Sequence, residues 1–173
     1  MSDDALPSKR GNWIWYFIAL ALVAGVLLLW LVLFIQVQLE SANQLKPEEL
    51  RAARDMWKKK GPKSYDMVYT VKRGGQAGVD TYYVVVRQGD VQSVLMNGKT
   101  ALENDKLDYH SMTGLFRDIE LFLQRDGKPD SPKTFCRGYF SGDDGRLILF
   151  VRRVRGSSEA VEIEVKEFKP IEG

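Results

Sequence analysis

The 173-residue chain has only one cysteine and one histidine, and it has little excess charge of either sign. Each of these features excludes a kind of bond, site or partner. The lone Cys136 cannot form an internal disulfide, so the fold must hold without one. The lone His110 leaves no second imidazole for a histidine-based metal site. The 25 basic and 23 acidic residues give a net charge of +2, which does not indicate a nucleic-acid-binding protein.

The sequence does contain one long apolar run. Residues 13–35 read WIWYFIALALVAGVLLLWLVLFI, without Asp, Glu, Lys, Arg or His. As a helix the run reaches roughly 34 Å at about 1.5 Å per residue, enough to cross a hydrocarbon core of about 30 Å. A buried helix of a soluble protein would need a larger core around it than this chain can build. We therefore predict a transmembrane helix at residues 13–36, which contacts the lipid bilayer through Trp13 to Ile35.

We expect this run to stay in the mature protein as a signal anchor. A cleaved secretory signal has an apolar region of about 7 to 15 residues and a small-residue cleavage site, and this run has neither feature. Lys9 and Arg10 lie just before it, whereas the next basic residue after it is Lys46. This asymmetry predicts a cytoplasmic tail at residues 1–12 and an extracytoplasmic or periplasmic C-terminal part. The predicted location is the cell inner (cytoplasmic) membrane of a bacterium, crossed in a single pass.

Beyond the run we predict a juxtamembrane linker at residues 37–46 and one extracytoplasmic domain at residues 47–170, since about 130 residues are too few for two cores. Pro47, followed by acidic residues and an apolar pattern of helical spacing, predicts a helix that packs through Trp57. A second helix is predicted after Ser111, where an apolar stripe follows a residue suited to cap a helix.

Alternating apolar residues predict strands before and after the second helix. The strands lie near residues 65–71, 82–86, 91–96, 134–141, 146–155 and 159–168, and residues 99–110 are a polar connection. In the last hairpin Ile148, Phe150 and Val154 are expected on one face. The predicted fold is therefore α+β: a transmembrane helix, then an antiparallel sheet domain with the order helix, three strands, helix, three strands and its helices on one face. This order suggests a two-fold repeat of one unit.

A family resemblance covers residues 50–170. It is carried by WKKKGPKSYD from Trp57, VVVRQGDVQSV from Val84, LFRDIE from Leu115 and FVRRVRGSSEAVEIEV from Phe150. These runs resemble an uncharacterised domain family of planctomycete-type bacteria, found on lipoproteins and membrane-anchored envelope proteins. The family has no assigned active site, so the resemblance implies a fold and an envelope location but no chemistry.

Residues suited to catalysis or metal binding are few. His110 is expected in a loop, and Cys136, inside a strand, is expected to be a buried, inert thiol. They would act as a nucleophile pair only if the fold brought them together. Asp143 and Asp144 lie between glycines, which favours a turn over a calcium site with its six to eight or so oxygen ligands. We predict no enzyme activity, no catalytic residue, no cofactor and no metal.

Two sets of residues are candidates for binding a partner. The first is Arg152, Arg153 and Arg155, which would bind an acidic protein or an envelope polymer. Alternatively, these arginines pair with the glutamates of the last predicted strand across the hairpin. The second set consists of tyrosines, which are enriched at recognition surfaces although most of these are expected in the core. They are Tyr65, Tyr69, Tyr82, Tyr83 and Tyr139.

These predictions indicate a membrane-anchored extracytoplasmic protein. We expect it to be a non-catalytic interaction or structural module of the cell envelope, with an envelope protein rather than nucleic acid as its partner. The alternative is a small-ligand-binding or inhibitor-like domain that uses the concave face of the sheet. That alternative requires a cavity beside the predicted helix at residues 112–123.

Overall fold

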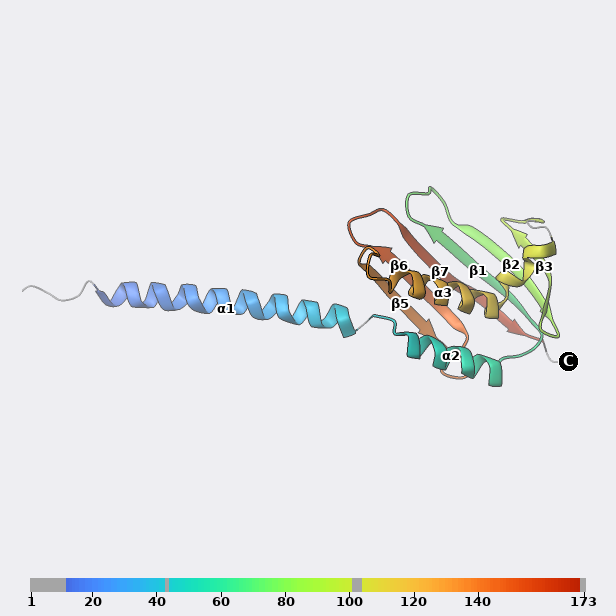
Figure 1. Cartoon of the computed structure of the whole chain (residues 1–173), viewed down its shortest axis with the longest axis horizontal. Coiled ribbons are helices and arrows are strands. Elements are labelled where there is room, and N and C mark those ends of the chain that lie inside the picture. The colour runs from blue at the N-terminus through green and yellow to red at the C-terminus, as the bar shows by residue number, and fades with distance from the viewer. Residues whose placement is uncertain (1–11, 43, 101–103, 172–173) are drawn as a thin grey trace, which may run out of the picture. The chain divides into compact units, whose positions relative to one another are not determined.

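A computed structural model describes residues 12–42, 44–100 and 104–171 of the chain. The chain divides into two compact units, Met1–Asn43 and Gln44–Gly173. The first contains helix α1 (Asn12–Ala42), and the second, called the C-terminal unit below, contains every other element (Figure 1).

Helix α1 is one continuous helix, and its sequence is apolar from Trp13 to Ile35. Its stretch from Trp15 to Val32 is long and apolar enough to cross a membrane, and none of that stretch is buried. The large apolar side chains described in α1 are between 45% (Ile18) and 73% (Tyr16) exposed. A helix packed on a soluble core would bury one face, so this pattern suits a lipid environment. The helix also includes residues 37–42, the first part of the predicted linker.

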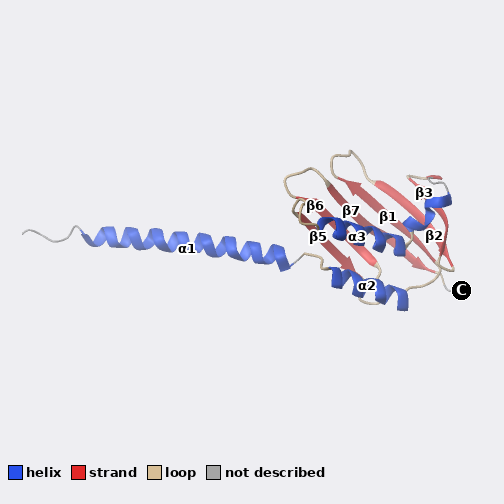
Figure 2. Ribbon diagram, in the orientation of Figure 1, coloured by secondary structure: helices blue, strands red, loops and turns tan. Residues whose placement is uncertain are grey.

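The C-terminal unit is built on one seven-stranded antiparallel sheet with the order β4-β3-β2-β1-β7-β6-β5. Its strands are β1 (Tyr65–Arg73), β2 (Asp80–Arg87), β3 (Asp90–Met96), β4 (Lys99–Thr100), β5 (Thr134–Phe140), β6 (Leu147–Val154) and β7 (Ala160–Pro170). Helices α2 (Pro47–Lys60) and α3 (Met112–Asp126) lie on the same face of this sheet (Figure 2). The predicted α+β class and antiparallel sheet are therefore confirmed.

The observed order of elements differs from the predicted order between β3 and α3. The predicted polar connection contains β4 and a 3-10 helix, η1 (Asn104–His110). Asn97 and Gly98 both have positive φ, at 52° and 78°, and this tight turn lays Lys99 and Thr100 against the end of β3. The short strand β4 was not predicted.

The suggested two-fold repeat does not extend to the sheet. Strands β1, β2 and β3 form one meander, and β5, β6 and β7 form another. The two meanders meet where β1, the first strand of one, pairs with β7, the last strand of the other. A two-fold repeat would place equivalent strands at the centre, so only the order of elements along the chain repeats.

Both predicted helices of the C-terminal unit are confirmed. Helix α2 begins at Pro47 and buries Trp57. Ser111 caps α3, because its Oγ accepts a hydrogen bond from the backbone N–H of Gly114 at 3.0 Å. Tyr65 of β1 links the two layers: its hydroxyl oxygen accepts from the N–H of Met112 at 2.9 Å, and its ring packs edge-on against Trp57.

Strand β6 shows one error in the predicted faces. Ile148 is 42% exposed, whereas its neighbour Leu147 is fully buried. The register of β5 against β6 shifts between Tyr139 and Phe140, and this irregularity places Leu147 opposite Phe140. Regular alternation resumes at Phe150, which is buried as predicted.

Candidate functional site

The three arginines predicted to bind a partner do not share a surface. Successive residues of a strand point to opposite faces, so Arg152 lies with Phe150 and Val154 on the buried face. Arg152 is only 1% exposed and is not available to a partner, which corrects the prediction for this residue. Arg153 and Arg155 are exposed and remain candidates.

Buried Arg152 is held by two acidic side chains. Its Nε and Nη2 each donate to one carboxylate oxygen of Asp126 at 2.7 Å, and its Nη1 donates to Glu159 at 2.7 Å. Its guanidinium also lies 5.3 Å from the centre of the Phe122 ring. Glu159 was among the expected partners, whereas Asp126, at the end of α3, was not.

The pKa values of this pair follow from the same contacts. Burial alone would raise the pKa of Asp126, but the hydrogen bonds from Arg152 and its positive charge outweigh burial and hold that pKa below its usual range. The hydrogen bonds to Asp126 raise the pKa of Arg152 above its already high usual value. Both groups therefore stay charged at neutral pH.

Cys136 and His110 have separate partners in the C-terminal unit. Cys136 is fully buried in β5, and its thiol donates to Asp126 at 3.7 Å. His110, the last residue of η1, stacks on Tyr82 with 4.9 Å between ring centres and shares a hydrogen bond with the Tyr69 hydroxyl through Nδ1. These contacts do not form a nucleophile–base pair.

We predict that Cys136 resists thiol reagents in the folded protein. The pKa of this thiol is raised from 9.0 to about 11, mainly by burial. At neutral pH this shift lowers the fraction of reactive thiolate about 100-fold. A maleimide reagent at neutral pH should label Cys136 only when denaturant is added. Rapid labelling of the folded chain would contradict the buried position.

Burial shifts the pKa values of both partners in the Tyr69–His110 hydrogen bond. It raises the pKa of Tyr69, so the hydroxyl stays protonated. It lowers the pKa of His110, which favours the neutral ring. Asp118 of α3 is also half-buried, and its burial raises the pKa of its carboxyl. The hydrogen bond between Tyr69 of β1 and His110 of η1 joins η1 to the sheet.

The lowered pKa of His110 predicts a loss of stability in mild acid. As the pH falls below about 6.5, the usual pKa of histidine, the unfolded chain takes up a proton before the folded chain does, and the free energy of unfolding decreases. Urea unfolding of the wild type and of His110→Gln at several pH values tests this. The variant should show a smaller decrease between about pH 7 and pH 5, and equal slopes would contradict the prediction.

Two of the five candidate tyrosines are exposed. Tyr65, Tyr69 and Tyr82 are at most 7% exposed and belong to the core, whereas Tyr83 and Tyr139 are 46% and 49% exposed. The exposed pair lies on the face of the sheet away from the helices, called the outer face below.

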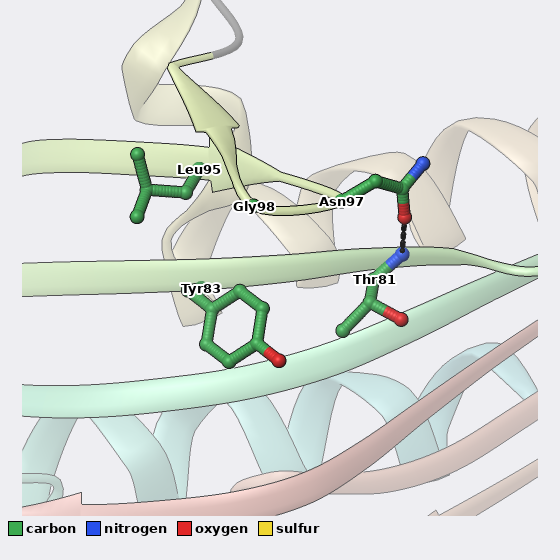
Figure 3. Close-up of a pocket in the computed structure, with 5 residues that line it drawn as sticks. All are labelled: Thr81, Tyr83, Leu95, Asn97 and Gly98. Atoms are coloured by element: carbon green, nitrogen blue, oxygen red, sulfur yellow. Dashed lines mark hydrogen bonds between the residues drawn. The ribbon is translucent and has the colours of Figure 1, made fainter.

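Tyr83 lines an open hollow of about 460 Å³ on the outer face (Figure 3). Its other lining residues are Thr81, Leu95, Asn97 and Gly98. The Asn97 side-chain oxygen accepts a hydrogen bond from the N–H of Thr81 at 2.8 Å, which fixes the rim (Figure 3). None of the five lining residues carries a carboxylate, imidazole, thiol or cationic group, so the hollow offers shape and apolar contact rather than acid–base chemistry.

A smaller cavity of about 150 Å³ lies between α2 and α3. Arg54 and Glu120, two of its lining residues, form an ion pair at 2.7 Å. Through this ion pair Glu120 joins the two helices. The cavity therefore lies beside a structural contact.

The Asp143–Asp144 segment forms a turn between β5 and β6. Asp144 accepts hydrogen bonds from the backbone N–H of Arg146 at 3.1 Å and from its guanidinium at 2.8 Å. Across the part of the chain that the structure describes, no group of three or more His, Cys, Asp or Glu residues is placed to hold a metal ion.

No family model and no curated protein matches this chain. The resemblance to a bacterial envelope domain family therefore stays a prediction.

Proposed function

We propose that this chain is a single-pass membrane protein of the bacterial cell envelope. Its C-terminal unit lies outside the cytoplasmic membrane and serves as a non-catalytic interaction or structural module. The observation that carries this proposal is α1, whose Trp15–Val32 stretch is apolar, exposed on all sides and long enough to cross a bilayer. The basic residues Lys9 and Arg10 before the helix support a cytoplasmic N-terminus.

The positions of the two most reactive side chains, Cys136 and His110, support a non-catalytic role. Cys136 is buried beside an ion pair, and His110 is packed on two tyrosines. Catalytic residues need access to a substrate, and neither of the two cavities described above is lined by Cys136 or His110.

Packing does not favour the small-ligand alternative on the helix-covered face of the sheet. Met112, Phe116 and Ile119 of α3 are fully buried there. Exposed apolar side chains lie instead on the outer face, where Tyr83 and Leu95 line the same hollow, and clustered exposed apolar surface is typical of protein contacts. The packing therefore supports a protein partner that binds the outer face.

Photo-cross-linking in native membranes tests this form of the proposal. A photoreactive amino acid in place of Tyr83 or Tyr139 should give adducts with another envelope protein. The same amino acid in place of Thr113, exposed on α3, is the matched control and should give few adducts. Adducts of the chain only with itself, or equal adducts from both faces, would contradict the proposal.

A further inference from the structure

Four basic side chains lie together at one corner of the outer face. They are Lys133, Arg137, Arg153 and Arg155, called the basic patch below. The β5–β6 register places Arg153 opposite Phe135, so Arg137, two residues further along β5, lies diagonally across from Arg153 on the same face. The backbone N–H of Arg155 donates to the carbonyl of Lys133 at 2.9 Å, which joins the two strand ends.

Among the described residues, the basic patch forms none of the ion pairs that hold basic residues elsewhere on the sheet. Arg73 pairs with Asp80 at 2.9 Å, Arg87 with Asp66 at 2.7 Å and Lys166 with Glu164 at 2.6 Å. Within the described ranges, the salt bridges include none of the four residues of the patch.

Arg137 adds an apolar and an unsatisfied contact to the patch. Its guanidinium lies 5.0 Å from the centre of the Phe135 ring. Its Nε is buried and has no hydrogen-bond partner within the described residues. The patch therefore combines positive charges that form no ion pair among the described residues with an aromatic surface, as membrane-contacting segments do.

The first residues of the C-terminal unit contact the strand that carries Arg137 of the basic patch. Gln44 donates a hydrogen bond to the carbonyl of Thr134 and accepts one from the N–H of Cys136, both at 3.4 Å, so the start of the C-terminal unit lies along β5. Only Asn43 separates Gln44 from Ala42, the last residue of α1. Part of the patch thus lies on β5, the strand that Gln44 contacts at the start of the C-terminal unit.

The part of α1 beyond its apolar run is long enough to cross the lipid headgroup region. Residues 36–42 add about 10 Å of helix after the apolar run ends. A bilayer of about 40 to 45 Å with a hydrocarbon core of about 30 Å has a headgroup region of about 5 to 8 Å on each side. The helix therefore ends close to the depth at which lipid headgroups meet water.

We propose that the basic patch binds anionic phospholipid headgroups of the membrane that holds α1. This inference rests on the proposed function, because it needs α1 in the bilayer. Each Lys or Arg next to an anionic lipid surface strengthens binding about five-fold, and salt weakens the attraction. Docking through the patch would hold the C-terminal unit against the membrane.

The test uses the full chain reconstituted in phosphatidylcholine vesicles, with and without phosphatidylglycerol. A fluorophore on Ser158→Cys, in the turn after β6, reports quenching by headgroup-labelled lipids, and Gln92→Cys on β3 is the control position. Buried Cys136 should not take up the label. Quenching at position 158 should rise with phosphatidylglycerol and fall again at high salt, while quenching at position 92 should change little.

Two triple variants separate the basic patch from net charge. The patch variant is Lys133→Gln/Arg153→Gln/Arg155→Gln. It should lower the ratio of docked to undocked C-terminal units by a factor on the order of 100. Lys58→Gln/Lys59→Gln/Lys60→Gln removes the same charge from the end of α2 and should leave the ratio almost unchanged.

Three results would overturn the proposal. They are no response to phosphatidylglycerol, equal losses in both triple variants, and a response to phosphatidylglycerol that the patch variant retains. If the chain ignores the lipid while the patch variant loses cross-links to an acidic protein, the patch binds protein instead. Alkaline carbonate distinguishes this failure from failure of the proposed function: a chain that stays in the vesicles but does not dock refutes only lipid binding.

Discussion

Replacing Asp126 with alanine should lower the free energy of unfolding of the C-terminal unit by about 3 to 5 kcal/mol. The Arg152 and Asp126 side chains are 2% and 7% exposed, so the variant leaves a buried guanidinium with only half-exposed Glu159 as an acidic partner. Removing one partner of a buried ion pair has an effect of this size because the remaining charge cannot recover its hydration. Urea unfolding followed by the circular dichroism of the sheet measures it.

Two further variants show whether the loss comes from the buried charge. Glu120→Ala removes an ion pair whose side chains are 27% and 36% exposed, and it should cost less than about 1 kcal/mol. Asp126→Ala combined with Arg152→Met removes both buried charges and should recover much of the lost stability. An Asp126→Ala loss as small as that of Glu120→Ala would contradict the account of this contact.

The wild type should also lose the contribution of Asp126 in acid. The folded-state pKa of this carboxyl lies below its usual 3.8, so the stabilisation is present above pH 3.8 and is lost as the pH falls further. The alanine variant should lack this part of the acid response.

Replacing Gly145 with alanine should cost about 2 to 5 kcal/mol. Gly145 has φ of +78°, and an added Cβ would lie at or within 3.0 Å of Ala53 O, Met56 Cβ and Trp57 N in α2. Two of these atoms are backbone and cannot move without shifting the helix. Positive φ in a residue with a side chain costs about 1 to 3 kcal/mol, and crowding a packed contact adds about as much.

Gly142→Ala is the matched control in the same turn. An added Cβ at Gly142 meets no atom within 4 Å, and its φ is not in the left-handed region. This variant should change the midpoint of urea unfolding very little. Equal effects of the two substitutions would show that the turn between β5 and β6 does not pack on α2 as described.

Local patterns in the sequence were sufficient to predict the helices and most strands of the C-terminal unit. Pro47 and Ser111 mark helix starts because their effect depends only on the first helical turn. Alternation predicts the strands for the same reason. Strand β4 was missed because its two residues carry no pattern of their own and pair only through the turn before them.

The errors at the candidate site have two physical causes. Charged side chains are usually exposed, and this expectation outweighed the alternation that places Arg152 on the same face as Phe150. The partner that makes this burial possible is Asp126, 26 residues earlier in the chain, and no short-range pattern links the two. Ile148 was misplaced because the register irregularity near Tyr139 cannot be read from β6 alone.

The basic patch also depends on the fold. Arg153 and Arg155 were predicted as binding residues from their own segment. Lys133 and Arg137 join them only through the pairing of β5 with β6. Only the fold shows that none of the four residues is held in an ion pair among the described residues.

Alkaline carbonate extraction of native membranes, combined with a reporter fused after Gly173 that is active only outside the cytoplasm, tests the central claim most directly. We expect the chain to stay in the membrane fraction and the reporter to be active. Release of the intact chain into the carbonate wash, or a reporter that works only in the cytoplasm, would contradict the proposed anchor and its orientation.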